Sequence, residues 1–189
     1  MANEKIIETI EIDGVEFTVI EKAKTIYAGS YFVAPDLESE PDWDASGQWF
    51  EKNKHKIIDV INPESTVCFS IDYTTNERPC ATLQGYETGS PNQPEGVHVI
   101  EADPVILIKV KATDAAWALT KKLTGYDPIC ISPLFFLIWQ LFCDGGECKY
   151  ERVGDISKGN HEAHYYSNGD TYVTVPVKRK DVIPEQWNN

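Results

Sequence analysis

The chain has 189 residues, 42% of them hydrophobic and 11% aromatic, which are the proportions of a folded protein that can form one core without a disulfide or a metal. It has 30 acidic side chains against 17 basic ones, so direct nucleic-acid binding is not expected, because that binding depends on Lys and Arg. The most apolar stretch, residues 129–142, is too short to cross a bilayer and contains Ser132-Pro133, so no membrane association is expected.

The cysteines and the N-terminus predict a cytoplasmic protein with free thiols. Five cysteines cannot all pair within one chain, and residues 1–5 lack the apolar core of a signal peptide. No cofactor is expected, because the chain has no glycine-rich phosphate loop, dinucleotide fingerprint or nucleophile elbow.

The first third of the chain is predicted to be β structure followed by a helix. Residues 6–20 alternate apolar and polar around Asp13-Gly14, which is typical of a hairpin, and residues 25–33 form another strand candidate. Ser39-Glu40-Pro41 supplies a helix start, and the helix is expected to end before Asn62-Pro63. Four apolar side chains share one face of this helix: Trp43, Phe50, Ile57 and Ile61.

The pattern then continues with a hairpin and begins again. Residues 67–73 and 81–87 flank a turn-rich segment and are expected to pair antiparallel. Residues 97–110 are rich in β-branched side chains, with a break at Asp103-Pro104. A short helix is expected over residues 114–123, ended by Gly125.

A second helix and a last hairpin complete the chain. Ser132 is expected to cap a helix that starts at Pro133 and runs over residues 134–142. Asn168-Gly169 suits a two-residue turn, which would place Tyr165 directly opposite Tyr172. These two tyrosines would then form an aromatic wall, or simply pack across the strands.

Six segments in order resemble the landmarks of one family, the GyrI-like effector-binding domains, which end AraC-type transcription activators and also occur alone in bacteria. These segments are Lys24 to Gly29, Gln48-Trp49-Phe50, Gly85-Tyr86-Glu87, Pro94-Glu95-Gly96-Val97, Phe136 to Phe142, and Tyr172 to Lys178. The resemblance covers about residues 15–180. Residues 1–14 are then an N-terminal extension or strand, and residues 181–189 are a loose tail.

The order strand, helix, hairpin, repeated once, predicts an α+β fold. The resemblance implies two βαββ (SH2-like) units with antiparallel sheets, related by a pseudo-two-fold axis, and an aromatic ligand cleft between them. Many members of the family carry a carboxylate in the closing strand that attracts cationic ligands. The matching position is Tyr172, so that role is not carried over to this chain.

The predicted ligand-binding residues are Trp49, Glu87, Trp139, Tyr165 and Tyr172. Glu87 and Tyr172 are also the candidates for catalysis, with the carboxylate as base and a tyrosine as proton donor. Ordinary packing explains the aromatic residues equally well, and a solvated strand end explains Glu87.

A metal site is not expected, although four side chains approach zinc-finger spacing: Cys143, Cys148, His161 and His164. The two histidines are three residues apart in a predicted strand and so face opposite sides of it.

The leading functional prediction is a module that senses or sequesters a hydrophobic small molecule. Cationic molecules are included in this class. One alternative is a hydrolase of strained or electrophilic small molecules. Another is an acidic inhibitor of a protein partner such as gyrase, with a surface that imitates DNA. The sequence leaves open whether the chain is a monomer or a homodimer.

Overall fold

The computed structural model describes residues 4–71, 79–144, 148–153 and 161–180. The strands in these ranges are β1 (Glu4–Ile12), β2 (Val15–Lys22), β3 (Thr25–Gly29), β4 (Phe32–Val33), β5 (Ser65–Ile71), β6 (Ala81–Thr88), β7 (His98–Ala102), β8 (Val105–Lys111), β9 (Tyr150–Arg152), β10 (His161–Tyr166) and β11 (Thr171–Arg179). The helices are α1 (Trp43–Asn53), the 3₁₀ helix η1 (Lys54–Lys56), α2 (Asp114–Thr124) and α3 (Ser132–Phe142). The predicted α+β class is confirmed.

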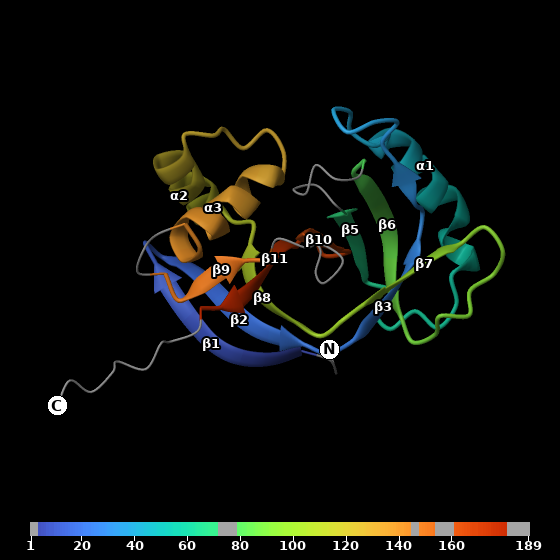
Figure 1. Ribbon diagram of the computed structural model, residues 1–189, viewed down its shortest axis with the longest axis horizontal. Coiled ribbons are helices and arrows are strands. Elements are labelled where there is room, and N and C mark those ends of the chain that lie inside the picture. Colours follow the sequence, from blue (N-terminus) through green and yellow to red (C-terminus); the bar gives the residue numbers. More distant parts are fainter. Residues whose placement is uncertain (1–3, 72–78, 145–147, 154–160, 181–189) are drawn as a thin grey trace.

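The described strands form one large antiparallel sheet in the order β1-β2-β8-β11-β10-β5-β6-β3-β7, with β4 beside β6 and β9 beside β11. Strands β2 and β3 lie far apart in this order, yet only Ala23 and Lys24 connect them. Strands β7 and β8 are likewise joined by Asp103 and Pro104 alone. The sheet has two limbs, β1-β2-β8-β11-β10 and β5-β6-β3-β7. Because the links between them are so short, the limbs must come close together at that end, and Figure 1 shows the sheet strongly curved.

The helices cover one face of this sheet in two separate groups. Helices α2 and α3 lie over one limb and α1 over the other, with β5 and β10 between them (Figure 1). Under α3 lies the largest hydrophobic core, which is formed by Leu134, Leu137 and Ile138 of the helix and by valines of β2, β8 and β11. Within the described ranges, no helix combines the length and the apolar character needed to cross a membrane.

Helix α1 is shorter than the sequence predicts. Asp42 caps it, because its side chain accepts a hydrogen bond from the backbone N–H of Ala45 at 2.8 Å. Beyond η1 the chain becomes extended at Ile57, and Val60 pairs with Thr88 of β6. The predicted helical face is therefore wrong at residues 57 and 61, because the chain leaves the helix after η1 and the backbone of Val60 and Ile61 then bonds to β6.

The ends of α2 and α3 follow different rules. Thr113 caps α2. Gly125 ends the helix at a φ of 76°, and this end is the one that the sequence predicts. Ser132 is the first residue of α3 and not its cap, because Ile131 takes the cap position without a side-chain hydrogen bond. Pro133 still occupies the first turn, where its missing N–H costs nothing.

The last hairpin has a different register from the one expected. Gly169 has a φ of 89°, and its N–H donates to Tyr166 O at 2.9 Å, so the loop has three residues instead of two. The extra residue pairs Tyr165 with Thr171 and His164 with Tyr172. The prediction that Tyr165 faces Tyr172 is therefore wrong, and the two tyrosines lie on opposite faces of the sheet.

Candidate ligand-binding cavity

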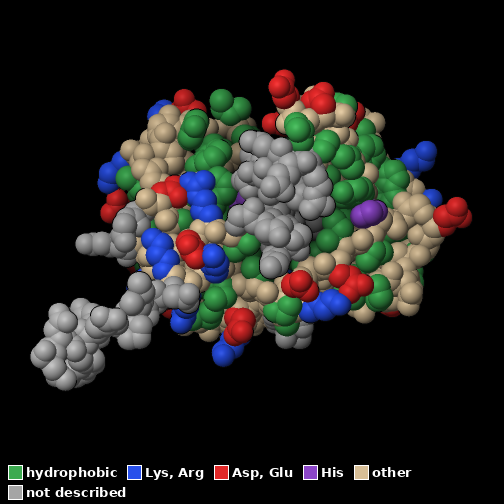
Figure 2. All heavy atoms as spheres, in the orientation of Figure 1, with side chains coloured by type: hydrophobic (Ala, Val, Ile, Leu, Met, Phe, Trp, Pro, Cys, Tyr) green, Lys and Arg blue, Asp and Glu red, His purple; other side chains and the backbone are tan. Residues whose placement is uncertain are grey.

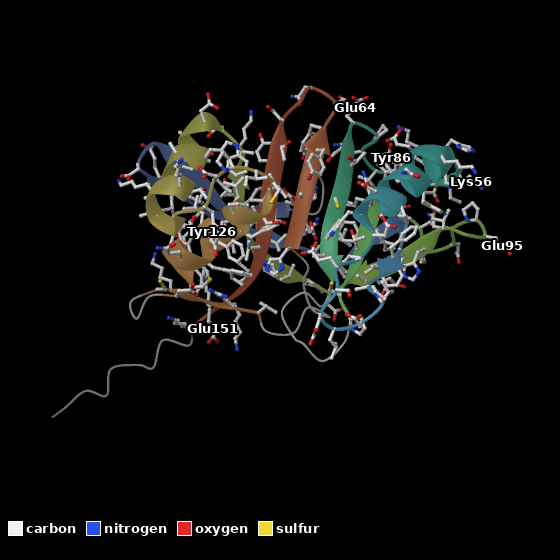
Figure 3. The ribbon with its side chains drawn as sticks, turned by 90° about the horizontal axis from the view of Figure 1, so that it is seen from above. Lys56, Glu64, Tyr86, Glu95, Tyr126 and Glu151 are labelled. Carbon is white, nitrogen blue, oxygen red and sulfur yellow. The ribbon has the colours of Figure 1, made fainter. Side chains whose placement is uncertain are left out.

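A cavity of about 330 Å³ lies on the helix-bearing face of the sheet, between α3 and the segment that leads into α1. Its lining consists of Glu40 and Trp43, of Cys68 and Ser70 on β5, of Cys130, Ile131, Ser132, Phe135, Phe136 and Trp139 at α3, and of His161, Ala163 and Tyr165 on β10. In the view from above (Figure 3), α3 and α1 stand on either side of the central strands. The two helix groups therefore form the walls, and β5 and β10 form the floor.

Trp139 forms a fixed wall of the cavity. The guanidinium carbon of Arg152 lies 4.1 Å from the centroid of its ring, and Arg152 is held in place by an ion pair with Asp144, whose Oδ1 is 2.8 Å from Nε. On other sides the indole contacts the rings of His161, at 4.9 Å, and Phe136, at 5.5 Å, both edge to face. These contacts fix the orientation of the indole before any ligand arrives.

The cavity is apolar and almost uncharged. Glu40, which accepts a hydrogen bond from Trp43 Nε1 at 3.1 Å, is the one charged side chain among the described residues that line it. Burial, and then the positive charge of Arg152, lower the pKa of His161 to about 4, so its imidazole is neutral at pH 7. Burial also raises the pKa of Tyr165 to about 12, which keeps its hydroxyl protonated.

The lowered pKa of His161 predicts a loss of stability in mild acid. In the unfolded chain the imidazole takes up a proton near its ordinary pKa of 6.5, whereas in the folded protein it resists protonation down to about 4. The unfolded state therefore binds more protons in this window, and the free energy of unfolding should fall by about 2 kcal/mol between pH 7 and 5. Urea unfolding at both pH values should show a smaller fall for His161→Phe. The matched variant of an exposed histidine, His55→Gln, should keep the wild-type fall, and equal falls in all three proteins would contradict the prediction.

A charged cluster is buried on the opposite face of the sheet. Glu162 accepts hydrogen bonds from Tyr27 Oη at 2.7 Å and from Lys22 Nζ at 3.4 Å, and its Oε2 lies 2.8 Å from Nε2 of His164. Lys22 also lies 3.8 Å from Glu87. Burial opposes both charged forms, but Lys22 and then His164 lower the pKa of Glu162 to about 2, and Glu162 and Glu87 raise the pKa of Lys22.

The predicted site residues fall into two groups. Trp139 and Tyr165 line the cavity. Glu87 lies on the other face of the sheet beside the buried cluster, and Tyr172 is on that face too. Trp49 lies on α1, where it is partly buried against the core between α1 and the sheet. The structure thus brings Trp139 and Tyr165 to one cavity and keeps Glu87, Tyr172 and Trp49 away from it.

Tyr172 lies at a second, more open hollow of about 680 Å³. Lys109 and Lys111 place their ammonium groups 5.1 and 5.8 Å from the centroid of its ring. Both lysines are already paired, Lys109 with Glu4 at 3.4 Å and Lys111 with Asp170 at 2.7 Å. The two lysines of this hollow are therefore compensated, and the hollow lies on the face away from the aromatic cavity.

Sequence reasoning missed most of the cavity lining. The stripe Ser132, Phe135, Phe136 and Trp139 follows the spacing of one helix face, so this part could have been found from the sequence. His161 could have been found by the alternation that places it on the same strand face as Tyr165. Trp43 and Ser70 come from distant parts of the chain, and no local pattern joins them to α3.

The four-residue array that approaches zinc-finger spacing is not assembled. His161 contacts Trp139 on the helix-bearing face, whereas His164 bonds Glu162 on the other face. Cys143 is buried in the core under α3. Among the described residues, no group of three or more His, Cys, Asp or Glu side chains is placed to hold a metal ion.

The fold can be compared with solved structures. The crystal structure of the EcmrR C-terminal domain is similar with a TM-score of 0.54 and 10% sequence identity, over 88% of this chain and 99% of that chain. Its fold is that of a GyrI-like effector-binding domain. The GyrI-like fold expected from the sequence landmarks is thus confirmed, although no family model and no curated protein matches the sequence. An integron cassette protein from the mobile metagenome of Vibrio cholerae is also similar, with a TM-score of 0.49 and 14% identity over 86% of this chain and 95% of that chain.

Proposed function

We propose that this protein binds a hydrophobic small molecule in the aromatic cavity and acts as a sensor or sequestering module. The observation that carries the proposal is a cavity of about 330 Å³ whose walls are aromatic rings held by their own neighbours. Small-molecule sites in proteins are concave, mostly apolar and largely formed in advance, with few polar groups. The GyrI-like fold supports the same reading.

Cationic ligands belong to the proposed class. Aromatic faces attract cations, and Glu40 supplies a negative charge beside Trp43 at the cavity. The net charge of −13 adds attraction at long range. Figure 2 shows hydrophobic side chains gathered on the α1 side of the face drawn there, and charged side chains of both signs on its other half and along its lower edge.

We further propose that the chain contains two βαββ units related by a pseudo-two-fold axis, with the cavity at their junction. In one limb the strand order is β3-β6-β5 and in the other it is β8-β11-β10, so corresponding strands take corresponding places. The limbs join through β5 and β10, which are corresponding strands and pair antiparallel, as a two-fold axis requires. This arrangement supports a ligand site shared by both units.

Binding can be tested with small hydrophobic cations and neutral aromatic compounds. A ligand at a hundred times its dissociation constant should raise the free energy of unfolding by about 2.7 kcal/mol. Trp139→Ala should weaken binding at least tenfold, because an aromatic anchor in a buried pocket is worth about 2 kcal/mol or more. Tyr172→Phe, on the opposite face, should bind as the wild type does. Equal affinities of Trp139→Ala and the wild type would contradict this site.

The hydrolase and the inhibitor alternatives stay predictions. A general acid-base pair needs both groups on one substrate, but Glu87 and Tyr172 lie on the face opposite the cavity that Tyr165 lines. The inhibitor alternative still depends on net charge alone.

A further inference from the structure

His161 is a buried polar group that opens onto the aromatic cavity. Its side chain is on β10, only 6% of the residue is exposed, and it is part of the cavity lining. Aromatic rings flank it, with the Trp139 centroid at 4.9 Å and the Phe135 centroid at 5.4 Å. These two neighbours contact His161 through their rings, and such contacts satisfy neither of its ring nitrogens.

The ring nitrogens of His161 have no hydrogen-bond partner among the residues that the structure describes. The contrast is His164 on the same strand, whose Nε2 lies 2.8 Å from Glu162 Oε2. In the described part of the chain, the one fully enclosed side-chain atom without a partner is Thr174 Oγ1, so the imidazole nitrogens of His161 are not fully enclosed, and the residue lines the cavity. A polar group that opens onto an apolar cavity can be satisfied there by water or by a ligand.

The polar part of the floor extends to the neighbouring strand. Ser70 on β5 lies directly opposite His161 in the strand register, and both residues line the cavity. A neutral imidazole offers one donor and one acceptor, and a hydroxyl offers both. The cavity therefore combines aromatic walls with a short polar strip at one place on its floor.

We propose that His161, with Ser70 opposite, is the polar anchor of the cavity, and that the ligand is a planar aromatic molecule carrying a hydrogen-bonding group on its edge. The ring system would lie against Trp139 and Tyr165, and the edge group would meet the imidazole. A ligand without that group would leave a buried polar side chain unsatisfied and so bind more weakly. This inference rests on the proposed function and specifies its ligand class.

The test compares the binding of naphthalene, 2-naphthol and quinoline. These molecules have similar size and shape and differ in the hydrogen-bonding group at the edge. Fluorescence titration of the wild type should show 2-naphthol or quinoline binding at least tenfold more tightly than naphthalene. His161→Phe should keep the affinity for naphthalene and lose this preference, whereas His161→Gln, which can still donate and accept, should retain part of it. His55→Phe, at an exposed histidine, is the matched control and should behave as the wild type does.

The outcomes separate this inference from the proposed function. Equal binding of all three probes by the wild type, or an unchanged preference in a folded His161→Phe protein, would overturn the role of His161 and leave the cavity as a binding site. Binding of none of the probes would count against the proposed function and the inference together. Thermal unfolding of each variant establishes that it is folded.

Discussion

Replacing Glu162 with leucine should lower the free energy of unfolding by about 3 to 5 kcal/mol, the cost typical of breaking a buried ion pair from one side. Only 3% of Glu162 is exposed, and its carboxylate bonds Tyr27 and Lys22. Without it, the ammonium group of Lys22 would remain buried with Glu87, 3.8 Å away, as its remaining carboxylate partner among the described residues. Urea unfolding at pH 7 measures the loss.

Two further proteins make this experiment decisive. The double variant Lys22→Met/Glu162→Leu should recover much of the lost stability, because removing both charges also removes their desolvation penalty. Lys121→Ala breaks the exposed pair with Asp127 and should change the free energy of unfolding little. If Glu162→Leu were no more destabilising than Lys121→Ala, the cluster would have no structural role. In the wild type, the contribution of Glu162 is present above pH 4.5 and is lost as the pH falls towards 2, since its pKa is lowered in the folded state.

Elements whose signals are local could be predicted from the sequence. Helix α2 has a capping threonine at its start and Gly125 after its end, and its bounds agree with the prediction. Helix α1 also has local signals, but its C-terminal part was decided by the backbone pairing of Val60 with Thr88, which are 28 positions apart. Periodicity extends a predicted helix until a tertiary contact competes with it.

Strands were easier to locate than the faces they present. The positions of β10 and β11 agree with the sequence, yet one additional loop residue, Ser167, turned Tyr172 to the opposite face from Tyr165. A shift of one residue exchanges the faces of a strand, so an error in the turn becomes an error in the site. This is why sequence reasoning placed Tyr165 and Tyr172 in one cleft.

The two clusters that matter most to the molecule depend on contacts between distant segments. Lys22 and Glu162 are 140 positions apart, and nothing near either residue indicates that it is buried with the other. Trp43 reaches the cavity from the start of α1 and His161 from β10, and the two residues are likewise distant in sequence. The order of strands in the sheet determines which of these distant residues come into contact. That order could not be predicted from composition or periodicity.

Gly85→Ala should destabilise the protein by about 3 kcal/mol or more, because the new methyl group has no space. A Cβ at residue 85 would lie 2.1 Å from the carbonyl oxygen of Ala28, and a Cβ at Gly29 would lie 2.2 Å from that of Gln84. These are backbone atoms of the paired strands β3 and β6, so they cannot rotate out of the way as a side chain would. Urea unfolding of Gly85→Ala and Gly29→Ala should show similar losses, because the two glycines face each other.

Gly47→Ala is the matched control and should have the opposite sign. Gly47 lies inside α1, where alanine is favoured over glycine by about 1 kcal/mol, and its new methyl group would meet only the side-chain Oε1 of Gln84 at 3.3 Å. If Gly85→Ala were as stable as Gly47→Ala, the strands would not be held as closely as the structure has them.

The glycine pair also bears on the cavity. Immediately after Gly29, Ser30 bonds the backbone of Gln84 and lies 2.7 Å, oxygen to oxygen, from the hydroxyl of Ser46 on α1. Ser46 is one helical turn from Trp43, so this contact ties the cavity end of α1 to the sheet. A variant that separates β3 from β6 should therefore weaken ligand binding at Trp43 as well as stability, whereas Gly47→Ala should leave both intact.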